Sequence, residues 1–361
     1  MSARRVLISG GGTGGHVYPA LAVGGALRAV DPSVEIVFIG SRRTIEKRIM
    51  DEHGARFIAM KIEGLRGRGL RSARGLLLLP AAFFKSLDLL VRIKPDLVIG
   101  VGGYSSGPLV LLAAWLRIPT LILEQNVRPG FTNRLLIRWT KKAVVAFPNS
   151  LPAFRGKGVW LGNPVRDEFH NLPPKAEGET LTLLVFGGSQ GSHFLNQAMT
   201  AALPLLREER GRLVIIHQTG KDDCEWVKQA YRDSGFDETP VAPYYPEMAA
   251  CFQKSDLIVS RAGATTCAEL IASGKPSLLI PFAGASENHQ EVNARELEKT
   301  GGAEVILERD LTPELLAARI RFYLGHRAEI RRMTESLAPL RTDKAAKKIA
   351  DLCLRLMAGE A

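Results

Sequence analysis

Three segments of the sequence combine glycine with small or hydroxylated residues, which are residue types that bind phosphate groups. They read Gly10-Gly-Gly-Thr-Gly-Gly-His16, Gly187-Gly-Ser-Gln-Gly-Ser192 and Ser260-Arg-Ala-Gly-Ala-Thr-Thr-Cys-Ala-Glu269. Each follows a short apolar run and precedes a helical pattern, where glycine lets a ligand approach the N–H groups at the start of a helix. An ordinary glycine turn is the alternative for the first segment, and a tight turn with an N-cap serine for the second. The third segment predicts a pyrophosphate site.

Two ionisable residues lie beside these loops. Glu269 is expected roughly one to two turns inside its helix, where a carboxylate can accept both hydroxyls of a ribose. A solvated helix glutamate is the alternative. His16 ends the first loop and is a candidate general base, with a structural or capping histidine as the alternative.

Further polar residues follow the ends of other predicted strands, on the edge where parallel sheets bind ligands. They are Gly102-Gly-Tyr104, Glu124-Gln-Asn126 and the amide-rich segment at 282–293, whose side chains suit sugar hydroxyls. No Asp-X-Asp pair occurs that would hold a divalent ion on a diphosphate. We therefore expect no metal, and helix N-termini with Arg166 or Arg261 must neutralise the diphosphate.

Nine apolar runs alternate with helical patterns and predict the strands that position these segments. They lie at 6–9, 35–39, 97–101, 120–124, 143–147, 181–186, 213–217, 257–260 and 277–281. Nearly every residue in them is apolar, which is typical of parallel strands covered by helices on both faces. Proline and charge interrupt this pattern at 163–178. We expect an N-terminal domain at 1–163, a C-terminal domain at 164–341 and a last helix near 342–361 that packs back on the first domain.

The composition indicates a globular protein with anionic partners. The 361 residues are 46% hydrophobic, and 48 Lys and Arg against 37 Asp and Glu give a net charge of +11. That charge suits nucleotide phosphates, nucleic acid or an acidic membrane surface. The four cysteines lack a C-x-x-C spacing, which argues against zinc and for a reducing, cytoplasmic compartment. The N-terminal pattern and the short apolar stretches predict neither a signal peptide nor a membrane-spanning helix.

In order and spacing, these motifs closely resemble the MurG family, the membrane-associated N-acetylglucosaminyltransferases of peptidoglycan synthesis. The resemblance covers essentially the whole chain and implies the GT-B fold, an α/β fold with two doubly wound Rossmann-like domains facing a cleft. The residues that carry it are Gly11-Gly-Thr-Gly-Gly-His16, Gly102-Gly-Tyr104 with Gly107-Pro108, Glu124-Gln-Asn126, Gly162-Asn-Pro-Val-Arg166, Gly187-Gly-Ser-Gln-Gly191, Arg261-Ala-Gly-Ala264 with Thr266 and Glu269, and His289-Gln290 with Asn293-Ala294.

The resemblance implies an inverting transfer of GlcNAc from UDP-GlcNAc to the muramyl 4-hydroxyl of undecaprenyl-pyrophosphoryl-MurNAc-pentapeptide (lipid I), which yields lipid II. The product serves cell-wall biogenesis, cell shape and cell division. His16 would be the general base, with Glu124 in reserve. The substrate-binding residues would be Thr13, Gly14, Gly15, Tyr104, Asn126, Arg166, Ser189, Gln190, Tyr245, Arg261, Gly263, Ala264, Thr265, Thr266, Glu269, His289 and Gln290.

The partners that the resemblance implies are UDP-GlcNAc, lipid I, an anionic membrane surface and other proteins of cell-wall synthesis. No cofactor and no nucleic acid are expected, and the protein would be peripheral on the cytoplasmic face of the inner membrane. Residues 61–84 are the expected docking segment, because Lys61 and four arginines at 66, 68, 71 and 74 precede leucines and phenylalanines. Leucines packed in the core are the alternative.

Three other functions each fit part of the sequence. A UDP-GlcNAc 2-epimerase would share the nucleotide site without a lipid-facing surface. A nucleic-acid-binding protein would explain the charge, but the sequence has no recognisable module and few aromatic residues. An NAD-dependent oxidoreductase is disfavoured because the first loop departs from the dinucleotide fingerprint and Glu35 begins rather than ends its strand.

Overall fold

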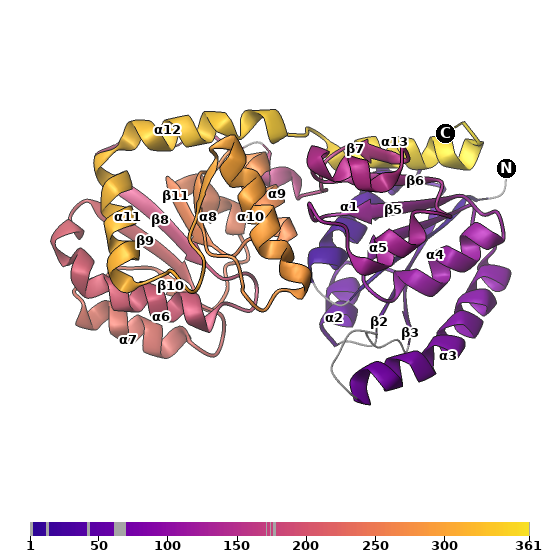
Figure 1. Ribbon diagram of the computed structural model, residues 1–361, viewed down its shortest axis with the longest axis horizontal. Helices are drawn as coiled ribbons and strands as arrows, with labels where there is room; N and C mark the ends of the chain where they lie inside the picture. The colour runs from indigo at the N-terminus through magenta and orange to yellow at the C-terminus, as the bar shows by residue number, and fades with distance from the viewer. Residues whose placement is uncertain are drawn as a thin grey trace. The chain divides into compact units, whose positions relative to one another are not determined.

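The chain forms two α/β units, each built on a parallel sheet (Figure 1). The computed structural model describes residues 3–11, 14–41, 44–60, 70–170, 172–173, 175 and 178–360. Unit 1 comprises residues 1–165 and 344–361, and unit 2 comprises residues 166–343. The C-terminal residues therefore belong to the unit that the N-terminus begins.

Unit 1 contains a seven-stranded sheet of order β3-β2-β1-β4-β5-β6-β7. Val6 of β1 pairs in parallel with Ile36 of β2 on one side and with Leu97 of β4 on the other. Strands β2 and β3 therefore lie on one side of β1, and β4 and the strands after it lie on the other side. This reversal of strand order makes the carboxyl ends of β1 and β4 a topological switch point. The strands are β1 (Arg5–Gly10), β2 (Glu35–Ser41), β3 (Phe57–Met60), β4 (Leu97–Gly102), β5 (Thr120–Glu124), β6 (Lys142–Val145) and β7 (Gly158–Trp160).

Helices cover both faces of this sheet, because alternate residues of each strand point to opposite sides. Val6 and Ile8 pack in a buried cluster with α1 (Gly14–Val30) and α13 (Ala345–Ala358). Leu7 and Val98 pack with α3 (Leu70–Ile93), α4 (Ser106–Trp115) and α5 (Phe131–Leu136). Burial on both sides explains why the strands are apolar at nearly every residue. The remaining helices are α2 (Thr44–Glu52) and the 3-10 helix η1 (Pro148–Phe154).

Unit 2 repeats the pattern with a six-stranded sheet of order β10-β9-β8-β11-β12-β13. Leu183 of β8 pairs with Ile215 of β9 and with Leu257 of β11, again in parallel. The switch point here lies at the ends of β8 and β11. The strands are β8 (Leu181–Phe186), β9 (Leu213–Gln218), β10 (Val241–Ala242), β11 (Leu257–Ser260), β12 (Ser277–Leu279) and β13 (Ala303–Val305).

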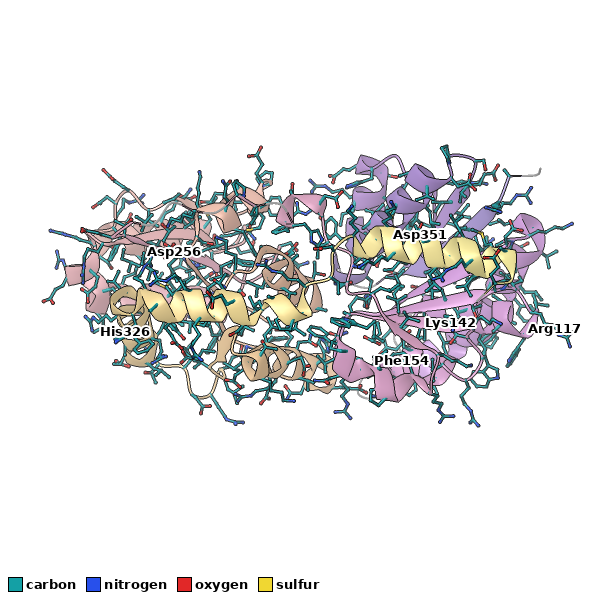
Figure 2. The ribbon with its side chains drawn as sticks, turned by 90° about the horizontal axis from the view of Figure 1, so that it is seen from above. Arg117, Lys142, Phe154, Asp256, His326 and Asp351 are labelled. Carbon is teal, nitrogen blue, oxygen red and sulfur yellow. The ribbon has the colours of Figure 1, made fainter. Side chains whose placement is uncertain are left out.

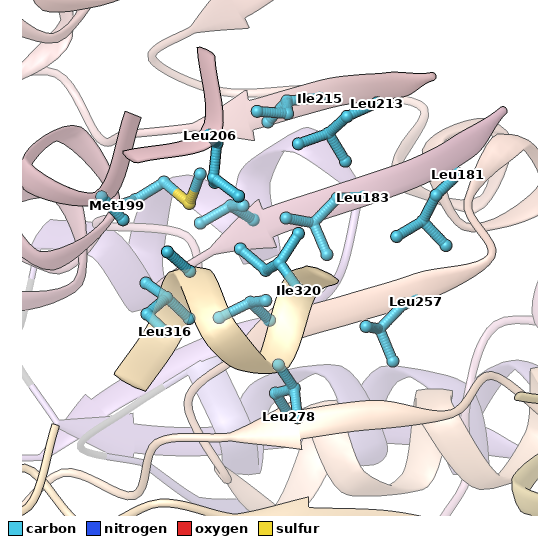
Figure 3. Close-up of a cluster of buried hydrophobic side chains, with 14 of the residues drawn as sticks. Leu181, Leu183, Met199, Leu206, Leu213, Ile215, Leu257, Leu278, Leu316 and Ile320 are labelled. Atoms are coloured by element: carbon cyan, nitrogen blue, oxygen red, sulfur yellow. The ribbon is translucent and has the colours of Figure 1, made fainter. Parts of the chain in front are cut away.

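The core of unit 2 lies on both sides of its sheet. Figure 3 shows one side, where Leu183 and Leu278 meet Met199 and Ile320 from the covering helices. On the other side, Phe186 contacts Phe252, with ring centroids 5.8 Å apart. The helices are η2 (Asp167–Phe169), α6 (His193–Ala202), η3 (Leu203–Glu209), α7 (Cys224–Asp233), α8 (Met248–Lys254), α9 (Ala264–Ser273), η4 (Ser286–Asn288), α10 (His289–Thr300), α11 (Pro313–Gly325), α12 (Arg327–Ser336) and η5 (Ala338–Leu340).

The predicted α/β fold with two doubly wound domains is confirmed, and all nine predicted strands occur within a few residues of their expected ends. Strands β3, β7, β10 and β13 were not predicted. Among the described residues, no helix has the length and hydropathy to cross a membrane.

A surface groove of about 600 Å³ lies beside α13 and is lined by Lys142, Leu161 and Asp351 among others (Figure 2). Its lining residues come from β6, from β7 and the residue after it, and from the C-terminal segment, and none of them belongs to the motifs singled out above.

Candidate active site

The first glycine loop and His16 lie at the switch point of unit 1. A Cβ atom added at Gly103 would come within 2.2 Å of the Gly11 carbonyl oxygen, and one at Gly102 within 2.8 Å of His16 Nε2. Both glycines also have positive φ, +99° for Gly102 and +79° for Gly103. Side chains at these two positions would push the loop and the imidazole away, so the glycines allow His16 to stand beside the end of β4.

Glu124 ends β5 and is buried. Its Oε1 accepts hydrogen bonds from Asn126 N at 3.0 Å and Asn126 Nδ2 at 3.2 Å, and its Oε2 accepts from Gly130 N and Asn133 Nδ2 at 2.9 Å each. Burial raises the pKa of Glu124, and these donors oppose that rise. The carboxylate organises the loop that carries Asn126. Glu124, the residue expected in reserve as a base, therefore accepts four hydrogen bonds from this loop and from α5.

Sequence analysis missed a second buried carboxylate, Glu46 of α2. It accepts hydrogen bonds from Ser41 N at 2.8 Å and Ser41 Oγ at 2.6 Å, and a Cβ at Gly11 would lie 2.7 Å from its Oε2. Glu46 therefore fills the space between the ends of β1 and β2.

The second glycine loop joins β8 to α6 in unit 2. Gly188 and Gly191 have φ of +97° and +76°, and a Cβ at Gly191 would lie 2.0 Å from the Thr219 carbonyl oxygen. Ser189 and Gln190 are exposed at the tip, and Ser192 is the N-cap of α6, accepting a hydrogen bond from Leu195 N. An exposed loop with a helix start behind it is suited to an anion.

The third motif joins β11 to α9. Gly263 is the N-cap of α9, and Ala264, Thr265 and Thr266 form its first turn. Thr265 Oγ1 is buried without a hydrogen-bond partner among the described residues. A buried hydroxyl that lacks a partner is costly, so a ligand oxygen at the start of α9 would satisfy it.

Glu269 lies further along α9 and has only 14% of its side chain exposed. Burial raises its pKa to about 7, the Arg166 charge opposes this shift, and Glu168 adds to it. Arg166 NH2 lies 3.8 Å from Glu269 Oε1, while its NH1 lies 2.9 Å from Glu168. Arg166 and Glu269, both predicted to bind the substrate, are therefore brought together.

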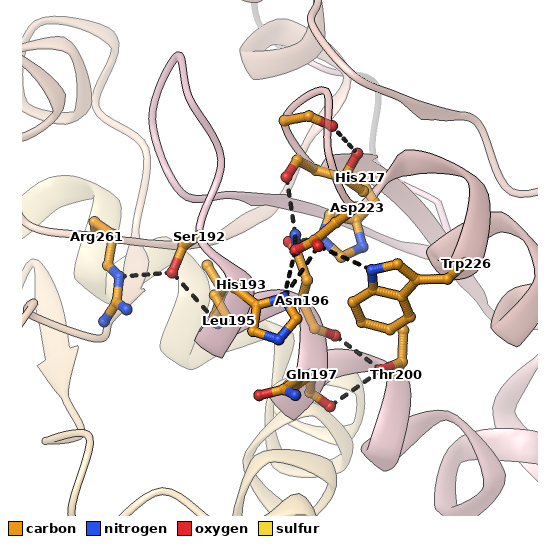
Figure 4. Close-up of polar contacts among 12 residues, drawn as sticks. Ser192, His193, Leu195, Asn196, Gln197, Thr200, His217, Asp223, Trp226 and Arg261 are labelled. Atoms are coloured by element: carbon orange, nitrogen blue, oxygen red, sulfur yellow. Dashed lines mark hydrogen bonds and ion pairs between the residues drawn. The ribbon is translucent and has the colours of Figure 1, made fainter.

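Arg261, which was expected to bind the diphosphate, is paired with groups of unit 2 itself. It is buried, with NH1 2.6 Å from Glu308 and 3.1 Å from the Ile280 carbonyl oxygen, while Nε donates to Ser192 Oγ at 3.0 Å (Figure 4). Its charge is thus paired inside unit 2, where it ties the loop after β11 to the N-cap of α6. Helix N-termini and Arg166 are the other groups expected to neutralise a diphosphate.

Two predicted residues lie on the loop and helix that follow β12. Gln290 Oε1 accepts a hydrogen bond from Phe282 N at 3.0 Å, and His289 Nδ1 donates to the Ser286 carbonyl oxygen at 2.5 Å. Tyr245 is half-buried after β10, and Tyr104 is half-buried after β4. Gly14 and Gly15 begin α1, whereas Thr13 lies outside the described residues.

The predicted residues therefore gather at one sheet edge in each unit. Besides Glu46, sequence analysis missed Gln218, which ends β9 at the same edge, and Glu308, the partner of Arg261. The position of Gln218 directly after an apolar run was the available signal, whereas nothing in the sequence links Glu308 to Arg261. In the described part of the chain, no group of three or more His, Cys, Asp or Glu side chains is arranged to hold a metal ion.

Comparison with known proteins agrees with this arrangement. The glycosyltransferase family 28 N-terminal domain matches residues 6–145, and the family 28 C-terminal domain matches residues 182–352. A protein of Anaeromyxobacter sp. (strain Fw109-5), the UDP-N-acetylglucosamine--N-acetylmuramyl-(pentapeptide) pyrophosphoryl-undecaprenol N-acetylglucosamine transferase, is 45% identical over 98% of this chain and 93% of its own length. The crystal structure of Acinetobacter baumannii MurG superposes with a TM-score of 0.81 at 30% identity, covering 98% of this chain and 99% of that one.

The chain belongs to the MurG family. Membership of the MurG family carries the GT-B fold with it. The N-terminal domain match lies within unit 1, and the C-terminal domain match covers most of unit 2 and extends into α13 of unit 1. A putative UDP-N-acetylglucosamine 2-epimerase from Listeria monocytogenes also superposes, with a TM-score of 0.72 over 99% of this chain and 97% of its own. Its identity of 13% indicates a shared fold alone.

Proposed function

We propose that this protein transfers GlcNAc from UDP-GlcNAc to the muramyl 4-hydroxyl of lipid I and so forms lipid II. The observation that supports this most strongly is the donor edge of unit 2, in a chain of the MurG family. There, a glycine loop, the open start of α9 and a buried carboxyl group at Glu269 follow neighbouring strands.

Unit 2 offers a group for each part of the donor. Glu269 accepts hydrogen bonds from the ribose hydroxyls, and the N–H groups at the start of α9 and in the loop at 187–192 bind the diphosphate, assisted by Thr265. The backbone carbonyl group of Tyr245, whose N–H donates to Gln218, binds the uracil base, and Gln290 binds the sugar. Direct contacts of the other predicted binding residues with the substrates remain predictions.

His16 of unit 1 acts as the general base. As the muramyl oxygen attacks C1, the bond between C1 and the UDP oxygen breaks, the hydroxyl proton passes to the imidazole and the electron pair leaves with UDP. A single displacement inverts C1 and needs only one base. Helix N-termini stabilise the charge that develops on the diphosphate, so the chemical step requires no metal.

Turnover of UDP-GlcNAc with a water-soluble lipid I analogue tests this function. We expect UDP release coupled to a disaccharide whose new bond has the β configuration by NMR, and excess EDTA should leave the rate essentially unchanged. Epimerisation of UDP-GlcNAc at C2 without an acceptor would support the 2-epimerase instead. Activity that chelation abolishes and Mg²⁺ or Mn²⁺ restores would contradict the metal-free step.

The protein docks on an anionic membrane through unit 1. On the face covered by α3, α4 and α5, which pack against one another, large apolar side chains are exposed: 74% for Phe84, 59% for Val91 and 57% for Trp115. Trp139 is also exposed, as are the cations Arg117, Arg134 and Arg138. Aromatic and cationic groups together suit a lipid headgroup region.

The docking segment expected at 61–84 lies largely outside the described residues. The backbone is described again from residue 70, where α3 begins, and the side chains from residue 80. Phe84 is the described member of that segment with high exposure, and the surface extends from it to α4 and α5. Contacts with other proteins of cell-wall synthesis stay a prediction.

A further inference from the structure

Gln218 makes hydrogen bonds to two segments that the proposed function assigns to different parts of the donor. It ends β9 and is only 1% exposed. Its Nε2 donates to the Gly188 carbonyl oxygen at 3.0 Å, and its Oε1 accepts from Tyr245 N at 2.8 Å. The partners fix the orientation of the amide, because a carbonyl oxygen requires a donor and a backbone N–H requires an acceptor.

The backbone around Gln218 separates the same two segments. On one side, Gly191 packs on the Thr219 carbonyl oxygen, where no side chain would fit. On the other side, Thr219 N donates to the Ala242 carbonyl oxygen at 3.0 Å, and Gly220 N donates to that of Pro243 at 3.1 Å. Residues 218–220 are therefore a spacer between the glycine loop at 187–192 and the turn at 242–245.

A buried polar network holds this spacer in place (Figure 4). Asn196 Nδ2 donates to the Thr219 carbonyl oxygen at 2.8 Å and to Asp223 at 2.7 Å, and Asn196 Oδ1 lies 3.1 Å from His217 Nε2. His217 Nδ1 lies 3.0 Å from the Tyr231 hydroxyl. Burial lowers the pKa of His217 to about 3, so this histidine is neutral at physiological pH and the network does not change charge there.

We propose that Gln218 is a positioning residue for donor selectivity: it fixes the distance between the base-binding turn at 242–245 and the phosphate-binding loop at 187–192. This inference rests on the proposed function and adds a determinant to it. A ligand that reaches both segments must match the spacing that Gln218 sets. Without the amide, each segment can still bind its own part of the ligand, but the two no longer act together.

The test compares the affinities of UDP, CDP and uridine by calorimetry for the wild type and Gln218→Met, which removes both hydrogen bonds with little change in volume. We expect the preference for UDP over CDP to fall at least about tenfold, and the gain in affinity from uridine to UDP to fall by a similar factor. In turnover, KM for UDP-GlcNAc should rise far more than kcat falls. Gln197→Met, at an exposed glutamine of α6, is the matched control.

If Gln218 had only a structural role, its substitution would lower the melting temperature and weaken the binding of all three ligands equally. The affinity ratios of UDP to CDP and of UDP to uridine would then be unchanged, and that result would overturn the inference. Gln218→Asn is the second variant if Gln218→Met does not fold, since it keeps an amide that is too short to reach both partners. If the wild type binds neither UDP nor uridine, the proposed function is wrong and the inference falls with it. If both variants keep the wild-type selectivity for UDP, the inference is wrong, but the proposed function is not contradicted.

Discussion

At the residue scale, the carboxyl group of Glu269 should make donor binding depend on pH. Burial raises its pKa to about 7, and only the carboxylate can accept both ribose hydroxyls. The binding-competent form is therefore lost as the pH falls below about 7. We expect the Kd of UDP-GlcNAc to be level above that pH and to rise towards about tenfold per pH unit below it, measured by calorimetry from about pH 5.5 to 8.5.

Glu269→Gln is the matching variant. It should flatten this pH profile and weaken binding at pH 8, while Glu269→Ala should lose about 2 to 4 kcal/mol of transition-state stabilisation in kcat/KM. Because the folded pKa is raised from its ordinary 4.5, this group stabilises the fold fully only below that pH, and the contribution is lost as the pH rises through about 7. Glu269→Gln should therefore raise the melting temperature at pH 8. A pH-independent Kd in the wild type would exclude the ribose role.

Substitution of His16 should lower the rate of the chemical step and leave the affinity for the donor unchanged. If it accepts the hydroxyl proton, His16→Ala lowers kcat by about 10² to 10⁴ while the Kd of UDP stays within a few-fold. Single-turnover kinetics and calorimetry separate the two. His53→Ala, at an exposed histidine directly after α2, is the control. Normal turnover by His16→Ala would indicate a structural role for His16 and make Glu124 the candidate general base.

At the element scale, the glycine loop between β8 and α6 depends on Gly191. Its φ is +76°, and a Cβ atom there would lie 2.0 Å from the Thr219 carbonyl oxygen, so no side chain fits. Gly191→Ala should destabilise unit 2 by about 1 to 3 kcal/mol and abolish UDP binding, by thermal melts and calorimetry. Gly211→Ala, where a Cβ would meet nothing within 4 Å, is the control and should keep both properties. Equal effects of the two substitutions would contradict a specific role for the loop.

Elements with long apolar runs were predictable, and those without them were not. Leu181–Phe186 is apolar at five of six positions, whereas the missed strand β10 is the dipeptide Val241–Ala242 and β13 contains Glu304. Short edge strands are defined by their neighbours in the sheet, which a local pattern does not contain. For the same reason, the sequence did not predict the buried pairs of residues that lie far apart in the chain. Arg261 meets Glu308, and Gln218 meets Tyr245, only after the strands between them have been ordered in the sheet.

At the scale of the whole molecule, the net charge of +11 and the exposed apolar side chains of unit 1 should act together at a membrane. Replacing Phe84, Val91 and Trp115 by Ser should reduce cosedimentation with vesicles of phosphatidylglycerol and phosphatidylcholine several-fold, because apolar area is lost from the interface. The binding that remains should be more sensitive to salt, since it relies on charge. Turnover of the water-soluble lipid I analogue should be retained.

The control replaces exposed apolar side chains of unit 2 by Ser. Leu205 and Val214 of unit 2 are 37% and 43% exposed, and Leu205→Ser with Val214→Ser should leave vesicle binding unchanged. If the unit 1 triple variant folds and binds vesicles like the wild type, the membrane contact lies elsewhere on the chain.

The membership of α13 in unit 1 has a consequence for how the protein is made. Ile349, Leu352, Cys353 and Leu356 complete the cluster around α1, yet they are translated after every residue of unit 2. Unit 2 is one continuous stretch and can fold while it emerges from the ribosome, whereas the N-terminal part of unit 1 has an uncovered apolar face until α13 has been synthesised. During synthesis, that part of unit 1 is the segment of the nascent chain most in need of a chaperone.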